Sequence, residues 1–391
     1  MAARNSNVAA LMTFSAFLGL GFALPFLPLF VQELGVHDPA DAAQWAGFLI
    51  GVGPLLAGLL APFWGGLADR HGYKPVAVLA LVAIGLGQVV AALAARPGHV
   101  LVSRMLSGFF GGVGPLGLAM ASAQGARGKG ASGSIGKIQA AQILAAGFGP
   151  LLGGALASAF GIRAAFWGAS MACVFAALVV GAFYIEGRPA SPVPANAGDG
   201  GARAASGLFF ATLVFTVFFV NFASRSFTPI LPTQLRTFGV PSASLALSTG
   251  ILISVYSVAA AASSFGFGRL ASTIEPIRLL GVSLLLSLLA AIWMAYVETF
   301  EAFLGVAVVF GLVSGGSLTL GYSIGSRSFS EAARGASFGK LSGAALIGGA
   351  VSPSIAAFVA RWRLEDVYWM NAAIYALLIL TAVGLRRRQP P

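Results

Sequence analysis

Charged residues are scarce in this sequence of 391 residues. Only 9% are Asp, Glu, Lys or Arg, whereas 58% are hydrophobic. Soluble domains carry about 25% charged residues, so the composition excludes a water-soluble protein. Because a membrane-spanning helix needs about 20 residues, a chain with twelve of them has no room for a catalytic or nucleic-acid-binding domain. The sequence therefore predicts an all-α membrane protein.

Cysteine, histidine and mid-span acids are equally scarce. The single cysteine, Cys173, lies in an apolar run and cannot form an internal disulfide. The three histidines, His37, His71 and His99, are far apart and lack metal-ligand spacing. No His, Asp or Glu occurs at a mid-span position. We therefore expect no metal, no cofactor and no enzymatic activity.

Apolar runs bounded by charged residues, proline or glycine predict twelve transmembrane helices. They lie at about 8–34, 42–68, 75–95, 99–123, 134–160, 163–185, 207–235, 243–271, 277–297, 301–326, 336–360 and 366–385. Residues 187–206 are rich in Pro, Gly, Ala and Ser, which predicts a flexible cytoplasmic linker. The chain thus divides into an N-terminal six-helix half, 1–186, and a C-terminal six-helix half, 207–391.

The two halves repeat one another. The segment Leu24–Val36 matches Phe227–Val240, with both prolines and the final glycine in register. Because each repeat has an even number of spans, both repeats share one orientation in the membrane. Parallel repeats of this kind are typical of one class of transporters, whose substrate site lies between the halves. The sequence therefore predicts two pseudo-symmetric halves around a substrate site.

The lysines and arginines indicate the orientation of the spans. Most lie in the loops and tails that a cytoplasmic N-terminus would place on the inner side. Those in outer loops are few: Arg96, Arg163, Arg236, Arg361 and Arg363. Since cytoplasmic loops carry the excess of Lys and Arg, we expect both termini in the cytoplasm.

The loop GGLADRHGYKP follows the second predicted span. Gly65 permits close helix approach, and Gly72 permits a tight turn. Asp69 is placed to accept hydrogen bonds from a nearby helix N-terminus, while Arg70 and Lys74 add positive charge. We expect this loop to act as a conformational switch that latches and releases the inner ends of the halves. The alternative is an ordinary basic turn.

A second motif, RMLSG, places Arg104 in the fourth predicted span. A bare arginine is costly in hydrocarbon, so its side chain is expected to face the bundle interior or a wet cavity and to mark function. The alternative is an arginine near the end of the span that reaches to the membrane surface.

A third motif, GFGPLLGG, lies in the fifth predicted span. Pro150 removes a helix hydrogen bond and predicts a bend. Gly149, Gly153 and Gly154 would let a partner helix pack on the bend. Generic packing of a kinked helix is the alternative interpretation.

Together these motifs resemble those of the major facilitator superfamily, over nearly the whole chain. The resemblance implies the major facilitator fold. The first loop resembles the family pattern G-x-L-A-D-R-x-G-R-K, with Tyr73 where the family usually has a basic residue. In the second-half copy of the loop, Ser272 replaces the aspartate.

The resemblance also implies roles for the other motifs. RMLSG resembles the span-4 motif of proton-coupled transporters, which implies that Arg104 takes part in proton coupling. GFGPLLGG resembles the span-5 motif of exporters that work as antiporters, although Ala145 replaces one glycine. The segments PFLPLFVQELGV and APFWGGLADRHGYK further resemble the drug:proton antiporter branch, in particular the MdtG-like multidrug exporters.

An antiporter needs a group that exchanges a proton, commonly a buried carboxylate. With no mid-span acid available, Glu33 at the end of the first span is the best candidate. The alternative is that Glu33 is an outer-loop acid in water.

A second arginine, Arg225, lies in a seventh span that prolines interrupt. With Asn221 it is suited to an anionic or strongly polar substrate, or it is a structural arginine bonded to freed carbonyls. Gln139 and Gln142 share one helix face. Further polar candidates for the cavity lining are Tyr256 and Tyr322.

The sequence thus predicts a monomeric transporter of the inner membrane, with protons, small-molecule substrates and the lipid bilayer as partners, and no nucleic acid. We expect proton-coupled export of drugs or small amphipathic molecules by alternating access. The alternative is export of an anionic or polar metabolite that Arg225 binds in the cavity.

Overall fold

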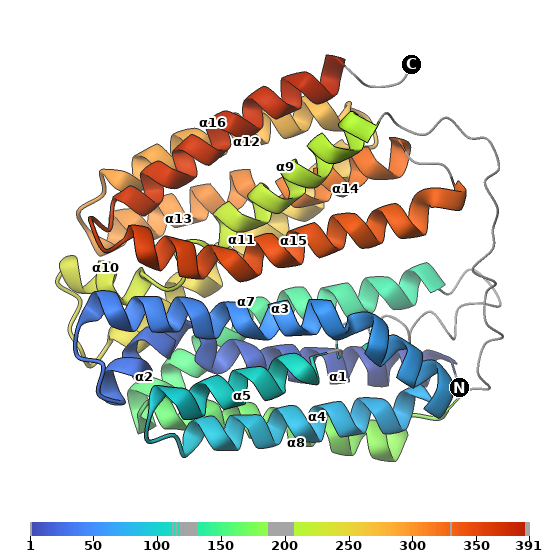
Figure 1. Cartoon of the computed structure of the whole chain (residues 1–391), viewed down its shortest axis with the longest axis vertical. Coiled ribbons are helices and arrows are strands. Elements are labelled where there is room, and N and C mark those ends of the chain that lie inside the picture. Colours follow the sequence, from blue (N-terminus) through green and yellow to red (C-terminus); the bar gives the residue numbers. More distant parts are fainter. Residues whose placement is uncertain are drawn as a thin grey trace. The chain divides into compact units, whose positions relative to one another are not determined.

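The computed structural model describes residues 2–111, 113, 116, 117, 120, 131–186, 207–328 and 331–387. All regular elements in these ranges are helices (Figure 1). The described residues contain 11 spans that are long and apolar enough to cross a membrane. The predicted span at about 99–123 begins as a helix and runs into residues outside these ranges, and the predicted linker 187–206 also lies outside them.

The chain forms two compact units. The first comprises Met1–Ser191 and Leu231–Ser254, and the second comprises Pro192–Ile230 and Val255–Pro391. The segment Leu231–Ser254 therefore packs with the first unit, although the sequence repeat places it in the second half. The division of the chain at the linker stays a prediction.

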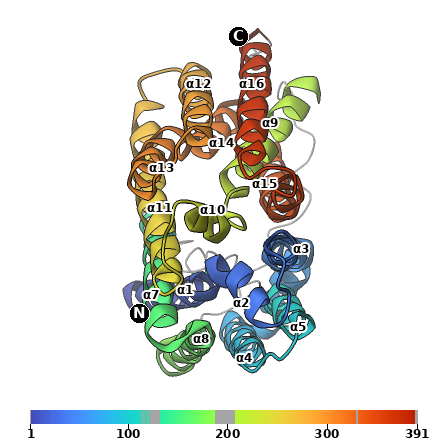
Figure 2. The same ribbon diagram turned by 90° about the vertical axis from the view of Figure 1, so that its left-hand side faces the viewer.

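In the first unit, helices α1 and α4 both pack against α8. Helix α1 also contacts α7, and α4 also contacts α5 (Figure 2). The elements of this unit are α1 (Ala2–Ala23), η1 (Leu24–Phe26), α2 (Leu27–Glu33), α3 (Pro39–His71), α4 (Tyr73–Ala92), α5 (Pro97–Phe109), α7 (Ala131–Phe160), α8 (Ile162–Phe183), α10 (Leu231–Thr237) and the start of α11 (Leu245–Leu270).

The second unit repeats this packing. Helix α9 contacts α15, as α1 contacts α7, and α12 contacts α16 and α13, as α4 contacts α8 and α5. Its elements are α9 (Gly207–Arg225), the remainder of α11, α12 (Pro276–Ala295), α13 (Phe300–Ser314), α14 (Ser317–Ser328), α15 (Glu331–Val359) and α16 (Asp366–Arg387). The internal repeat predicted from the sequence is therefore present in the helix contacts.

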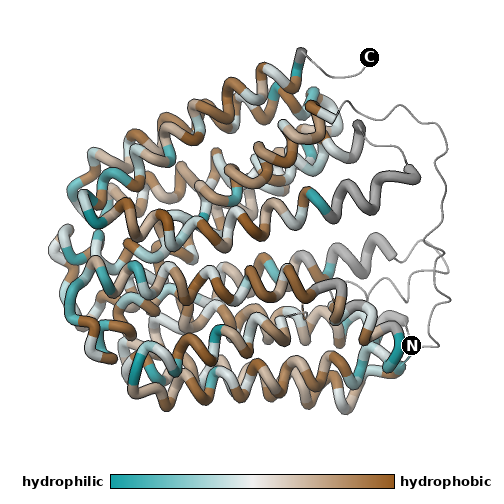
Figure 3. The backbone as a smooth tube through the Cα atoms, in the orientation of Figure 1, coloured by the Kyte–Doolittle hydropathy of each residue, from teal (hydrophilic) through white to brown (hydrophobic). Residues whose placement is uncertain are grey.

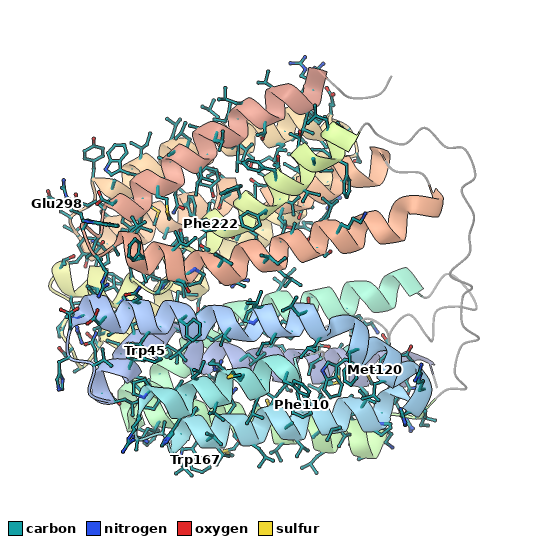
Figure 4. The ribbon with its side chains drawn as sticks, viewed as in Figure 1. Trp45, Phe110, Met120, Trp167, Phe222 and Glu298 are labelled. Carbon is teal, nitrogen blue, oxygen red and sulfur yellow. The ribbon has the colours of Figure 1, made fainter. Side chains whose placement is uncertain are left out.

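Many small residues lie between the helices, and many large hydrophobic residues are exposed, as expected for a protein in lipid. Many buried positions hold alanine, including Ala80 and Ala169, whereas large side chains such as Leu86 and Met171 are exposed. Trp167 on α8 projects away from its unit and is 44% exposed (Figure 4). Hydrophobic residues run along most of the helix lengths (Figure 3). Because lipid provides no hydrophobic drive between helices, close packing through small residues holds them together.

The tenth predicted span is two helices separated by two glycines. Helix α13 ends at Ser314 and α14 begins at Ser317. The Gly316 N–H donates to Ser263 Oγ at 3.0 Å, and Ser283 Oγ donates to the Val313 carbonyl at 2.6 Å. Side chains from neighbouring helices thus satisfy the backbone groups that the break frees, as a membrane interior requires.

The first unit has the corresponding feature. Helix α5 ends at Phe109, and Gly111 follows in non-helical conformation. A Cβ added at Gly111 would lie 2.7 Å from Ala57 Cβ on α3. In the second unit, a Cβ added at Gly315 would overlap backbone atoms of Ala260 on α11. In each unit, the glycine after α5 or α13 therefore lies close to the second long helix of the repeat, α3 or α11.

We predict that Gly315→Ala destabilises the protein by about 2 kcal/mol, because overpacking a tight contact typically costs 1–3 kcal/mol. Its helical backbone conformation accepts alanine, so the cost is steric. The control is Gly305→Ala on α13, where an added Cβ meets nothing within 4 Å and removing a helical glycine is stabilising. Unfolding midpoints in detergent measure both. Equal midpoints for the two variants would contradict the contact.

Candidate transport site

The loop between α3 and α4 turns at Gly72, which has φ +93°. This left-handed conformation favours glycine, so the predicted tight turn is present. Arg70 is exposed and Lys74 is half-buried. Gly65 lies within α3, and the side chain of Asp69 lies outside the described part of the structure.

A residue that the sequence analysis did not select holds this loop. Glu186, just beyond α8, accepts hydrogen bonds from the backbone N–H groups of Tyr73 at 2.9 Å and Lys74 at 2.8 Å. These N–H groups open α4, whose preceding residue is a glycine without a capping side chain. The absence of a capping side chain before α4 is the only sequence signal that another group caps this helix. The sequence does not indicate which residue does so, because Glu186 lies more than 100 residues away.

Arg104 lies inside the first unit. Its side chain is 3% exposed, which contradicts the alternative that it reaches the membrane surface. Its Nη2 donates to Gln88 Oε1 on α4 at 2.9 Å, and Gln88 Nε2 donates to Ser107 Oγ at 3.4 Å. The Nε of Arg104 has no partner among the described residues. The arginine is therefore a buried positive charge held by a neutral amide.

Glu33 does not join this group. It is the last residue of α2, and its side chain is exposed. No bond between Glu33 and Arg104 occurs in the part of the chain that the structure describes. Its role in proton exchange stays a prediction.

The glycines of the third motif bring α7 into backbone contact with α1. A Cβ added at Gly149 would lie 3.1 Å from the Cα of Gly21. A Cβ added at Gly153 would overlap the carbonyl of Phe22. Helix α7 continues through Pro150, and the bend expected there stays a prediction.

Residues of α7 also lie close to the start of α11. A Cβ added at Gly154 would lie 2.8 Å from the carbonyl oxygen of Ala246. A Cβ added at Gly250 would overlap the carbonyl of Pro150. The sequence analysis missed Ala246 and Gly250, since one small residue in an apolar span carries no signal of its partner.

Helix α10 meets α2 at corresponding positions of the two sequence repeats. Arg236 Nη1 donates to Gln32 Oε1 at 2.7 Å. Gly35 and Gly239 end the two helices with φ of +101° and +79°. The same glycine turn thus follows α2 and α10, and Gln32 and Arg236, three residues before each glycine, bond to each other.

The predicted cavity residues are distributed over both units. In the second unit, Asn221 Nδ2 donates to the Ala345 carbonyl at 2.6 Å, which ties α9 to α15. Arg225, the last residue of α9, is exposed. Beside it on α9, Phe222 (Figure 4) accepts a hydrogen bond from Ser352 Oγ at 2.6 Å. Arg225 therefore lies next to the α9–α15 contact, and its guanidinium group takes no part in the two hydrogen bonds that join these helices.

The other candidates lie in different surroundings. Tyr256 packs against the rings of Phe227 and Phe310, with centroids 5.2 and 5.9 Å away. Tyr322 on α14 is half-buried. Gln142 on α7 is also half-buried, and the side chain of Gln139 lies outside the described residues. The structure thus places Gln142 in the first unit and the other described candidates in the second.

Repeated helix bundles with close glycine contacts and a buried arginine are typical of membrane transporters built from two repeats. The family model described as Major Facilitator Superfamily matches residues 9–248 and 213–391. The chain belongs to this superfamily, and its fold is the twelve-helix major facilitator fold. As a member it is a multi-pass membrane transporter of small molecules and not an enzyme.

Curated relatives carry a common name. The Multidrug resistance protein MdtG of Proteus mirabilis (strain HI4320) is 29% identical over 385 residues, covering 96% of this chain and 95% of the relative. The protein of that name from Yersinia enterocolitica is 33% identical over 300 residues, covering 76% of this chain and 72% of the relative.

Solved structures share the fold. A bacterial homologue of the human lysosomal transporter Spinster has a TM-score of 0.81 at 17% identity, covering 98% of this chain and 96% of that one. The human organic anion transporter MFSD10 has a TM-score of 0.70 at 18% identity, covering 97% of this chain and 99% of that one.

We predict that Gly250→Ala lowers transport turnover at least about tenfold, an effect equivalent to about 1.4 kcal/mol in the barrier. The added methyl group must separate α7 from α11 at Pro150. Efflux of a fluorescent amphipathic dye from cells measures the effect, with membrane protein levels matched. The control is Gly266→Ala, farther along α11, where a Cβ meets nothing within 4 Å. If both variants transport at the wild-type rate, the α7–α11 contact has no role in the cycle.

Proposed function

We propose that the chain exports drugs or small amphipathic molecules in exchange for protons, by alternating access of its two six-helix halves. The observation that supports this proposal most strongly is the glycine contact of α7 with α1 and α11. Gly149, Gly153 and Gly154 occupy the positions that the antiporter-type motif predicted to be close-packed. The name of the curated relatives, which refers to multidrug resistance, supports the same substrate class.

Proton coupling in this proposal depends on Arg104. A positive charge in a site of low dielectric lowers the proton affinity of groups near it. Arg104 is bonded to an uncharged amide rather than to a carboxylate, so its field is not neutralised by that partner. We therefore propose that Arg104 takes part in proton coupling within the first half by lowering the proton affinity of groups near it. Glu33 is the acid we propose for proton exchange at the membrane face, where its exposure gives it access to water.

The loop between α3 and α4 is the conformational switch in this proposal. Gly72 fixes its turn, and Arg70 and Lys74 are its cations. We place the loop and both termini in the cytoplasm, the chain in the inner membrane as a monomer, and the moving bodies at 1–186 and 207–391. The excess of Lys and Arg on one side supports this orientation.

Proton flux tests the proposal directly. Energised inside-out vesicles that contain the protein are challenged with cationic, neutral and anionic compounds, and a pH-sensitive dye reports the gradient. At least one amphipathic compound should dissipate the gradient with the intact protein. With Arg104→Ala the effect should fall about tenfold or more, because the buried charge is lost. A protein that moves no compound, whatever the gradient, would defeat the proposal.

A second candidate function is export of an anionic or polar metabolite. Arg225 favours it, because this arginine is exposed at the end of α9 beside Asn221, and no carboxylate bonds it among the described residues. An arginine in such a position is suited to bind carboxylate or phosphate groups.

Replacing this arginine separates the two candidates. If the substrate is an anion, Arg225→Ala should reduce anion transport at least about tenfold, since a charge-assisted pair contributes about 1.5–3 kcal/mol. Transport of neutral compounds should change less than twofold. Arg225→Lys, which keeps the charge, is the matched control. Vesicle uptake of labelled compounds is measured for the wild type, Arg225→Ala and Arg225→Lys. An equal loss of transport for anionic, neutral and cationic compounds in Arg225→Ala would contradict anion binding.

A further inference from the structure

The N-terminus of α4 lacks a cap of its own. The first N–H groups of a helix have no partner within that helix and need an acceptor. Gly72, which precedes α4, has no side chain, and the first turn of the helix contains no acidic residue. Water or a polar group from elsewhere in the chain satisfies these donors, and an anionic group gains most from the helix dipole.

Glu186 supplies that group with both carboxylate oxygens. Its Oε1 accepts from the Tyr73 N–H at 2.9 Å, and its Oε2 accepts from the Lys74 N–H at 2.8 Å. A Cβ added at position 72 would lie 3.0 Å from the carboxyl carbon of Glu186. Gly72 is therefore needed for the positive φ of the turn, and a side chain there would also displace the carboxylate.

The residues before Glu186 fix its position. Asn5 Nδ2 donates to the Ile185 carbonyl at 2.7 Å, and the Ile185 N–H donates to Asn5 Oδ1 at 3.1 Å. Tyr184 is 2% exposed and belongs to the core of the first unit. The carboxylate is thus presented from a backbone segment held on one side by α1 and on the other by the core.

We propose that Glu186 is a positioning residue for transport, which holds the switch loop between α3 and α4 to the end of α8. The two bonds make the start of α4 and the residue that leads into segment 187–206 move as one body. This inference rests on the proposed transport cycle, and it holds for any substrate or coupling ion.

The second repeat offers a matched comparison. Glu275 precedes α12 as Gly72 precedes α4, but its carboxylate pairs with Arg278 at 2.7 Å within the same turn. Pro276 opens α12 and has no N–H to satisfy. The second repeat therefore begins this helix with local groups only. Between these two helices of the described structure, only α4 in the first repeat has its N-terminus capped by a carboxylate from a distant segment.

Hydrogen exchange and transport kinetics together test the assignment. In Glu186→Gln the carboxylate charge is lost and an amide N–H₂ faces one of the backbone donors. The amides of Tyr73 and Lys74 should exchange at least about tenfold faster, because their acceptor is weakened. Dye efflux should lose about fivefold or more in maximal rate, with the half-saturating dye concentration changed less than twofold.

Two variants serve as controls. Glu275→Gln should leave both measurements within twofold of wild type. Glu186→Asp keeps the charge on a shorter side chain, so it should change both in the same direction but by less. If Glu186→Gln does not reach the membrane, the Asp variant decides the question by the same two measurements.

Hydrogen exchange and transport rate test different parts of the proposal. Unchanged exchange at Tyr73 and Lys74 in Glu186→Gln would overturn the capping geometry. Faster exchange with an unchanged maximal rate would overturn the positioning role and leave Glu186 as a fold element only. Exchange does not depend on a substrate. A failure of drug–proton exchange would show as a wild-type protein without proton flux, while the exchange result still tests the cap.

Discussion

Close backbone contact between helices is the constraint on which the rest of this structure depends. Lipid is as apolar as the helix surfaces, so hydrophobic burial cannot hold the helices together, and association depends on packing and hydrogen bonds. Helix α7 meets this requirement on two sides, at Gly149 and Gly153 against α1 and at Gly154 against α11. Each contact is tight enough to exclude a methyl group, which leaves the helices few alternative arrangements.

Several of the polar side chains in this bilayer-spanning chain satisfy backbone groups that helix ends and breaks leave free. The break between α13 and α14 is closed by Ser263 and Ser283. The start of α4 is closed by Glu186. Arg104 is 3% exposed, and its Nε is one of several buried side-chain atoms that lack a partner in the described residues. It is the charged residue among them, and a buried charge is the most costly of these groups. Arg104 is therefore the strongest candidate for a functional role.

The sequence predicted the fold well because its signals are local. Apolar runs and punctuation place the predicted span 42–68 within a few residues of α3, and matched prolines predict the repeat. The glycines of α7 carried their own motif. Glu186, Gly250 and the Gln32–Arg236 bond could not be predicted, because each depends on a partner in a distant segment. The substrate is open for the same reason, since its site is assembled from several helices.

The central claim is alternating access by movement of the two proposed halves, 1–186 and 207–391. Because Gln32 on α2 and Arg236 on α10 belong to different halves, we propose that their bond opens in every cycle. The claim is tested most directly by cross-linking Gln32→Cys to Arg236→Cys with cleavable reagents of graded length, in a protein whose only native cysteine is replaced (Cys173→Ala). The wild-type side chains are joined at their ends by a hydrogen bond of 2.7 Å, so a linker that replaces the reach of both side chains spans the positions. The account predicts that the cross-link stops transport and that reduction restores it. Transport at the uncross-linked rate while the linker is intact would contradict alternating access through this contact.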